Sequence, residues 1–212
     1  MSGDKMMHQT RGPVWPRKHQ RQGRIPPGLR GLDREATWSY SKSDGWVYGH
    51  GSCCLVAHRP VVLGACKAMR NSAHEAKRLW WETGHLNGLV QTVMMDSKAD
   101  DQALFFEFHR QRGMTLLTWP RRHSDHTARR RARLRPLNTP HHTRVSKERG
   151  QTVEPMQGVV KEIFGLERCW MRGHRHNRWL FAAMGVAVQL HQAHALQEKR
   201  STWKIKHEVL GL

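Results

Sequence analysis

The sequence has few acidic residues: 17 Asp and Glu stand against 36 Lys and Arg in 212 residues, giving a formal net charge of +19. With a pI near 11, such a chain attracts polyanions through phosphate neutralisation and counterion release. DNA and RNA are the leading partner classes, and an anionic membrane is the competing one. The length favours one domain with a basic appendage over two independent enzyme domains.

The chain also lacks a long apolar run. The longest such stretch, residues 179–190, is too short to span a bilayer. No charged segment followed by an apolar one marks a signal peptide. We therefore expect a soluble, cytoplasmic protein with no membrane partner.

Cysteine is scarce, and the four residues form no C-x-x-C pair. The adjacent Cys53 and Cys54 are poorly placed for a zinc knuckle, so we expect reduced, buried thiols. The 16 histidines are scattered along the chain. His191 and His194, three apart on an expected helix, more often mark a helix face than a ligand pair.

Residue patterns in the N-terminal half predict a loop, then strands, then a helix. The first thirty or so residues are rich in Arg, Gln, Pro and Gly, which predicts an irregular basic loop. Two or three short antiparallel strands are expected within residues 38–65. A helix is expected from Ser72 to about Thr83, with Ser72 and Glu75 forming a capping box.

A strand, helix and strand are expected next, over residues 89–95, 100–112 and 114–118. The first is a buried apolar run, and Gly113 ends the helix. This order implies a parallel pair of strands and an α/β sheet.

The C-terminal third begins with a strongly cationic stretch. Residues 119–150 contain nine arginines and one lysine against two acids, with no apolar period, so an irregular loop is expected there. Thr152 is then expected to cap a helix that Gly165 ends, and Asn177 to cap a long apolar helix. The tail from residue 201 is expected to be basic and peripheral.

Three carboxylates stand out in this basic chain. Asp96 ends the apolar run 89–95, where open α/β sheets place their active sites, although a cap or loop role is equally open from position alone. Glu154 is expected on a first helical turn beside Pro155, where the helix dipole alone favours an acid. Asp4, taken alone, would be a frayed terminal aspartate. A carboxylate near phosphates makes physical sense mainly with a divalent cation between them.

Several segments, in this order and spacing, resemble the catalytic region of the DDE transposases encoded by bacterial insertion sequences. They are residues 4–15 (DKMMHQTRGPVW), 31–42 with 45–49, 95–101 (MDSKADD) and 152–158 (TVEPMQG) followed by Lys161. The resemblance implies an α/β fold of the ribonuclease H-like kind: a mixed sheet flanked by helices, with a basic irregular loop before the last catalytic helix. It places Asp4 on the first strand, Asp96 just after the fourth strand and Glu154 on a later helix.

The resemblance also implies a function. Asp4, Asp96 and Glu154 would be the catalytic residues and would ligate two Mg²⁺ or Mn²⁺ ions for cleavage and strand transfer of transposon-end DNA into target DNA. Residues 1–200 would form the catalytic domain, with the cationic loop at about 119–150, and residues 201–212 a basic tail. Because Asp4 stands so close to Met1, the first strand is expected to be truncated. A homo-oligomer in a synaptic complex and a location at the bacterial nucleoid are compatible with this function.

The cations between the second and third carboxylates are the expected DNA contacts. They are dense and unpaired by acids, which favours phosphate contact over a merely solvated charge run. Lys161, one helical face along from Glu154, is the best single candidate near the chemistry. The expected set is Arg121, Arg122, Arg129, Arg130, Arg131, Arg133, Arg135, Arg149 and Lys161. For Trp119 and Trp170, stacking on an unpaired base and core packing are both open.

Two alternatives remain beside the active transposase. The chain can be a truncated, catalytically inactive transposase remnant that only binds DNA. It can also be a basic RNA-binding protein, which predicts tight nucleic-acid binding with no metal requirement and no use for Asp96. The RNA-binding alternative has the composition but not the order of motifs.

Overall fold

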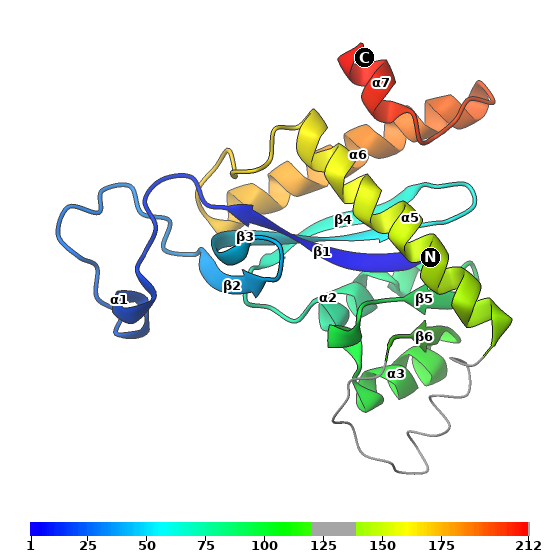
Figure 1. Cartoon of the computed structure of the whole chain (residues 1–212), viewed down its shortest axis with the longest axis horizontal. Coiled ribbons are helices and arrows are strands. Elements are labelled where there is room, and N and C mark those ends of the chain that lie inside the picture. The colour runs from blue at the N-terminus through cyan, green and yellow to red at the C-terminus, as the bar shows by residue number, and fades with distance from the viewer. Residues whose placement is uncertain (120–138, 212) are drawn as a thin grey trace.

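The computed structural model describes residues 1–119 and 139–211, and its strands form one mixed, curled sheet (Figure 1). β3 pairs antiparallel with three strands: β1 along one edge, and β2 and β4 along the other. β1 also pairs in parallel with β5, and β5 with β6. The α/β class and the expected parallel pair are thus confirmed. The strands are β1 (Ser2–Gln9), β2 (Thr37–Ser41), β3 (Gly45–Val56), β4 (Leu63–Arg70), β5 (Thr92–Met94) and β6 (Thr115–Leu117).

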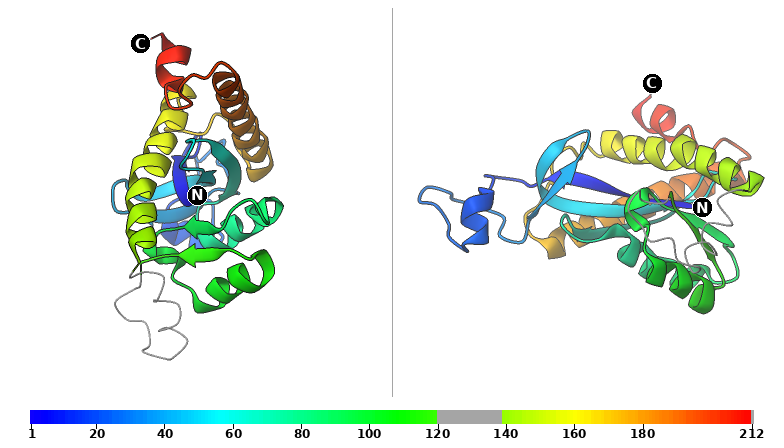
Figure 2. Two further views of the ribbon diagram at one scale, coloured as in Figure 1. Left: turned by 90° about the vertical axis from the view of Figure 1, so that its right-hand side faces the viewer. Right: turned by 60° about the horizontal axis from the view of Figure 1, so that its bottom comes forward.

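Helices cover both faces of the sheet, so the fold has three layers. α5 and α6 lie on one face, and α2 and α3 on the other, as Figures 1 and 2 show. Two short 3-10 helices, η1 and η2, flank β5. The helices are α1 (Arg17–Arg21), α2 (Glu75–Glu82), η1 (Gly84–Leu86), η2 (Ser97–Ala99), α3 (Gln102–Arg112), α5 (Pro140–Ile163), α6 (His174–Gln197) and α7 (Ile205–Leu210).

β3 supplies both hydrophobic cores, because successive side chains of a strand point to opposite faces. Cys54 and Val56 join the core under α5 and α6. Cys53 and Leu55 join the core over α2 and α3. All four cysteines are free and buried, as the sequence predicted.

The N-terminal segment corrects one expectation. The irregular loop predicted for the first thirty residues is wrong for β1, whose eight residues all pair with β3. Met6 and His8 alternate into the core under α6, where the His8 ring lies 4.7 Å from that of Phe181. β1, the strand that was expected to be truncated, therefore forms a continuous ladder with β3 around Asp4. The two-residue alternation of this strand was not recognised in the sequence because basic residues follow it.

The helix that carries Glu154 begins earlier than predicted. α5 starts at Pro140, and the Thr139 side chain caps it by accepting a hydrogen bond from the His142 N–H at 3.2 Å. The irregular loop predicted for residues 119–150 is therefore wrong over residues 140–150. Thr152 is not a cap, because its Oγ1 donates to the Glu148 carbonyl inside the helix. The buried face of α5 extends towards the N-terminus through Val145. The many arginines in this part of the sequence made that apolar face hard to recognise.

Two other predicted helix starts are also wrong. α2 begins after His74 with no side-chain cap, and the expected capping-box residue Glu75 is instead buried. α6 begins after Gly173, and Asn177 is buried within its first turn. The Asn177 amide donates to the carbonyls of Gly173 and Met171, so it ties the helix to the preceding loop.

The end of the chain is less peripheral than predicted. Thr202 and Ile205 are buried, and Ile205 joins the core under α5 and α6. On α7, Glu208 pairs with Arg200 at 2.8 Å and with His191 at 3.0 Å. His191 thus has a carboxylate partner on α7.

The strand before Asp96 is shorter than the apolar run that predicted it. Leu89 is 79% exposed and lies in a turn, and only the end of the run, Val93, Met94 and Met95, is fully buried. After β5, α3 ends as expected at Gly113, which has a φ of +61°. None of the helices in the described parts of the chain is long and apolar enough to cross a membrane.

Candidate active site

A pocket of about 580 Å³ opens where β1, the β2–β3 turn, the end of β5 and α5 meet. Its lining includes all three predicted catalytic carboxylates, Asp4, Asp96 and Glu154. Arg149 and Lys161, two of the predicted DNA contacts, line it as well. The fold therefore brings together residues that the sequence grouped only through the order of their motifs.

Asp4 and Asp96 lie on neighbouring strands of the sheet. Ser2 of β1 pairs in parallel with Met94 of β5, and each aspartate stands two residues further along its chain. The two carboxylates line the same pocket, and the charge of Asp96 acts on Asp4. Asp96 also caps η2, accepting a hydrogen bond from the Lys98 N–H at 2.8 Å. Asp96 thus follows the end of a strand and also caps a helix, which are the two positions that the sequence left open.

Asp96 follows the fifth strand, whereas the family resemblance implied the fourth. The difference arises because the segment between β1 and β5 forms three antiparallel strands, β2, β3 and β4. The expected range of two or three strands there included this outcome. The position of Asp96 beside the central strand β1 does not depend on the number of strands that precede it.

Arg149 joins two of the three carboxylates. Its Nη2 lies 3.1 Å from Asp4 Oδ2, and its Nη1 lies 3.1 Å from Glu154 Oε1. The other oxygen of Asp4 accepts a hydrogen bond from the Lys5 N–H at 2.8 Å. Arg149 was predicted to contact DNA, and in the protein alone it partly neutralises the pocket.

The pocket holds more negative charge than Arg149 offsets. Burial raises the pKa of Asp4 above its usual value, and the Arg149 charge and the Lys5 N–H counter this only in part. Asp96 and Glu154 raise the pKa of Asp4 further, so the carboxylates repel one another. Additional positive charge would stabilise them.

Glu154 and Lys161 occupy one face of α5. Glu154 is 59% exposed at the pocket rim, and Lys161 lies two helical turns further on. Gly158 lies between them on the same wall, four residues from Glu154. This placement agrees with the sequence interpretation of Lys161 as a residue one helical face along from Glu154.

Glu75 is a fourth carboxylate at this end of the sheet, and the sequence analysis missed its role. Its side chain is only 6% exposed, and its Oε1 has no hydrogen-bond partner among the described residues. Burial and the neighbouring Asp96 raise the pKa of Glu75 to about 8, and Lys5 is the cation that partly counters them. The available signal was helical spacing: Glu75 stands four residues before the fully buried Leu79, which puts an acid on the buried face of α2.

Most of the predicted DNA contacts lie outside the described residues. Trp119 and Trp170 are described, and they are 52% and 47% exposed, so neither is a core residue. The Trp119 ring lies edge-on to the His142 ring at 4.7 Å. The predicted contacts outside the described residues are Arg121, Arg122, Arg129, Arg130, Arg131, Arg133 and Arg135.

The pocket has the donor chemistry of a Mg²⁺ or Mn²⁺ site without being arranged as one. Carboxylate oxygens are the ligands that these hard cations prefer. Within residues 1–119 and 139–211, however, no three His, Cys, Asp or Glu side chains are grouped closely enough to hold an ion. The Arg149 guanidinium lies between Asp4 and Glu154 and contacts both. The two-ion site stays a prediction.

Comparisons of the chain with protein-family models, curated proteins and solved structures found no significant match. The fold class and the pocket are therefore the basis for any statement about function. Both come from the chain's own residues.

Proposed function

We propose that the pocket is the active site of a metal-dependent DNA-processing enzyme of the DDE transposase type. One observation carries this proposal: Asp4, Asp96 and Glu154 line a single pocket from β1, the end of β5 and α5. The sheet is compatible with a ribonuclease H-like fold, since the central β1 has an antiparallel neighbour on one side and parallel strands on the other.

A phosphodiester substrate suits the mixture of charges in the pocket. Cations there can bind phosphate oxygens, and the carboxylates can approach the same phosphates only if divalent cations lie between them. The overall charge of +19 adds long-range attraction for a polyanion. The cations that line the pocket are Lys5, Lys42, Lys98, Arg149 and Lys161.

The proposed roles follow from position. Asp4, Asp96 and Glu154 would hold Mg²⁺ or Mn²⁺ through their carboxylate oxygens. The bound ions would stabilise charge on the phosphoryl oxygens and lower the pKa of an attacking water or 3′-hydroxyl. Arg149 would exchange a carboxylate partner for a phosphate as the positive charge in the pocket rises. Lys161 would hold the same DNA strand from the next turns of α5.

Nicking of supercoiled plasmid and of transposon-end duplex, with Mg²⁺ or Mn²⁺ and with EDTA, tests this function. The wild type is expected to nick only when the divalent cation is present. Asp96→Asn keeps the size of the side chain and is expected to lower the rate by at least about a hundredfold. Asp44→Asn is the matched control, because Asp44 lines the same pocket from the β2–β3 turn and is not one of the proposed ligands.

Two results would contradict the proposed enzymatic activity. One is a wild type with no metal-dependent nicking, and the other is an equal loss of activity in the Asp96 and Asp44 variants. The first result would favour a DNA-binding remnant without catalysis. The observation that favours this second candidate is the position of Arg149, which already binds two of the proposed ligands.

A further inference from the structure

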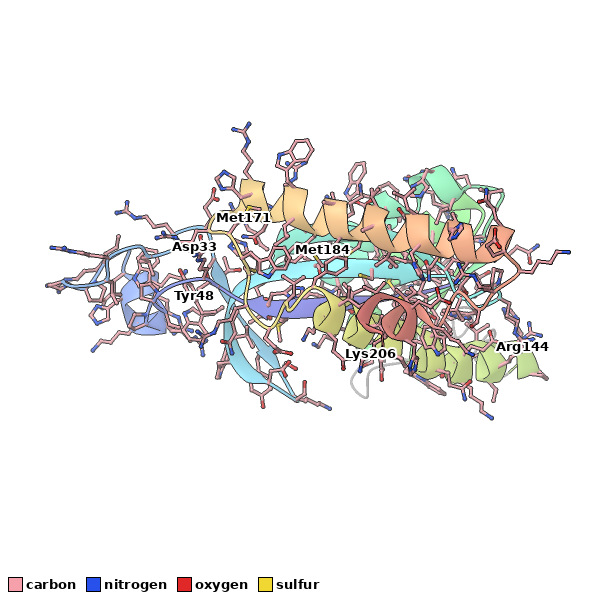
Figure 3. The ribbon with its side chains drawn as sticks, turned by 90° about the horizontal axis from the view of Figure 1, so that it is seen from above. Asp33, Tyr48, Arg144, Met171, Met184 and Lys206 are labelled. Atoms are coloured by element: carbon pink, nitrogen blue, oxygen red, sulfur yellow. The ribbon has the colours of Figure 1, made fainter. Side chains whose placement is uncertain are left out.

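Residues 11–36 form an arm that projects from the sheet beyond β2 and β3 and carries α1 (Figure 1). Figure 3 shows the same projection from above, with Asp33 and Tyr48 at its base. The pocket does not include any residue of the arm. The sequence predicted an irregular basic loop for most of this segment, with no binding role for its cations.

The arm is folded against the sheet by its own small core. Trp15, Ala36 and Tyr48 are buried there together, with Ile25 and other partly buried residues around them. The Trp15 Nε1–H donates to the Arg24 carbonyl at 3.0 Å, so the two ends of the α1 loop are joined. The Tyr48 hydroxyl donates to the Asp33 carbonyl at 2.6 Å and ties the arm to β3. The projection is therefore a built feature of the fold.

The acids of the arm are used within the fold. Asp33 is 3% exposed, and its carboxylate accepts hydrogen bonds from His50, from the Thr10 hydroxyl and from the Gly173 N–H. Glu35 accepts a hydrogen bond from the His174 N–H at the start of α6. Asp33 is thus withdrawn from the arm's surface, whereas Glu35 is exposed at the base of the arm beside α6.

The cations of the arm face outward. α1 has no buried residue and no acid in its first turn. Among the described residues, none of the arm's Lys or Arg side chains forms an ion pair with an acid. The arm thus presents several exposed positive charges on a segment that is packed at its base. The exposed cations are Arg11, Lys18, Arg21, Arg24, Arg30 and Arg34.

Two strands connect the arm and the pocket. β1 lines the pocket through Met7 and ends at Gln9, just before the arm. β2 starts at the base of the arm and ends at Ser41, where the turn that lines the pocket begins. Five extended residues span about 17 Å, roughly half of a helical turn of B-DNA. A duplex held in the pocket can therefore reach the arm within its next turn.

We propose that the arm binds the phosphate backbone of duplex DNA on the flank of the position held in the pocket. The choice of DNA rests on the proposed function. The exposed cations, the buried Asp33 and the packed base of the arm fit contacts that position a duplex without reading its sequence. The arm lengthens the DNA segment that the protein covers.

Fluorescence anisotropy in EDTA with two labelled duplexes tests this surface, because binding is then measured without cleavage. One duplex of roughly 10 base pairs, centred on the pocket, ends at the base of the arm, and one of roughly 25 base pairs extends along the arm. The arm variant Arg21→Gln/Arg24→Gln/Arg30→Gln is compared with Lys77→Gln/Lys199→Gln/Lys204→Gln, whose three exposed lysines lie outside both the arm and the pocket. Both variants lose the same charge.

The arm variant is expected to bind the long duplex roughly tenfold more weakly and to lower the slope of log affinity against log salt by about 2 to 3. Its affinity for the short duplex should match that of the lysine variant. Thermal unfolding verifies that both variants are folded. If the triple arm variant unfolds, Arg21→Gln alone on α1 provides the test, with a fall in the salt slope of about 1.

Three results would overturn the proposed surface. The first is an equal loss of affinity for the long duplex in the arm and lysine variants. The second is a loss of affinity in the arm variant that is the same for both duplexes. The third is a loss of affinity in the arm variant for duplex RNA but not for duplex DNA. The proposed function fails separately, through a wild type that shows arm-dependent DNA binding but no metal-dependent nicking.

Discussion

The base of the arm and the pocket hold carboxylates in opposite ways. Burial alone would raise the pKa of Asp33, yet hydrogen bonds from His50, the Gly173 N–H and the Thr10 hydroxyl lower it to about 2. This carboxylate is stable as an anion. It joins β3 and the loop before α6 to the arm, which is a structural task.

Asp4 in the pocket and Glu75, which neighbours Asp96, lack such compensation. Burial and like charges raise the pKa of Asp4 above its usual value and that of Glu75 to about 8. Arg149 and Lys5 offset only part of the effect. A fold that fully compensates one buried acid but leaves the pKa of two others raised close to further carboxylates is typical of a functional site, where perturbed carboxylates cluster.

The largest effect on stability is expected from Asp33→Asn. The substitution removes the charge that pairs with His50 and leaves its buried donors with a weaker acceptor, so we expect a loss of about 3 kcal/mol in the free energy of unfolding. Urea unfolding at neutral pH measures it. Glu35→Gln, which changes one contact at the same base, should cost about 1 kcal/mol.

Acid titration sharpens the prediction for Asp33. Its pKa is below the usual value in the folded protein, so its contribution is complete above about pH 4 and is lost as the pH falls towards 2. The Asp33→Asn variant should lack this part of the wild-type decline. Equal losses in the free energy of unfolding of the Asp33 and Glu35 variants would mean that the Asp33 carboxylate is not specially stabilised by its hydrogen-bond donors.

Glu75→Gln is expected to change the free energy of unfolding by a smaller amount and in the opposite direction, as a gain in stability at high pH. Between the usual pKa of 4.5 and the folded value of about 8, the folded protein keeps a proton that the unfolded chain releases, so wild-type stability falls as pH rises through this window. The variant should therefore be more stable than the wild type by about 1 kcal/mol near pH 9, with little difference near pH 5.

Urea unfolding at the two pH values measures the effect of Glu75→Gln. Glu82→Gln on the same helix is the matched control, because Glu82 pairs with Arg78 and is not among the groups that shift the pKa of Glu75. The control should show no gain at high pH. Destabilisation of the Glu75 variant by the same amount at both pH values would show that its carboxyl is compensated like that of Asp33.

The sequence was most informative where one segment alone determines the structure. The parallel strands β5 and β6 and the end of α3 at Gly113 follow from apolar runs and a glycine stop. Motif order also led to Asp4, Asp96 and Glu154, which line one pocket. Local patterns and a family resemblance were sufficient for these features.

Features that depend on contacts between distant segments were not predictable. The start of α5 depends on burial of Val145 against Met94 and Leu117, and the burial of Ile205 depends on its neighbours on α5 and α6. Glu75 was interpreted as a helix-capping acid because nothing in its local sequence shows that Asp96 lies beside it. The pairing of Arg149 with Asp4 also needed the fold.

Binding of Mn²⁺ to the DNA-free protein, followed by electron paramagnetic resonance or calorimetry, tests most directly whether the pocket carboxylates form a divalent cation site. Wild type and Asp44→Asn are expected to bind Mn²⁺ with similar affinity, and Asp96→Asn at least about tenfold more weakly. Lack of binding by the wild type, or the same affinity in all three proteins, would contradict this account of the pocket.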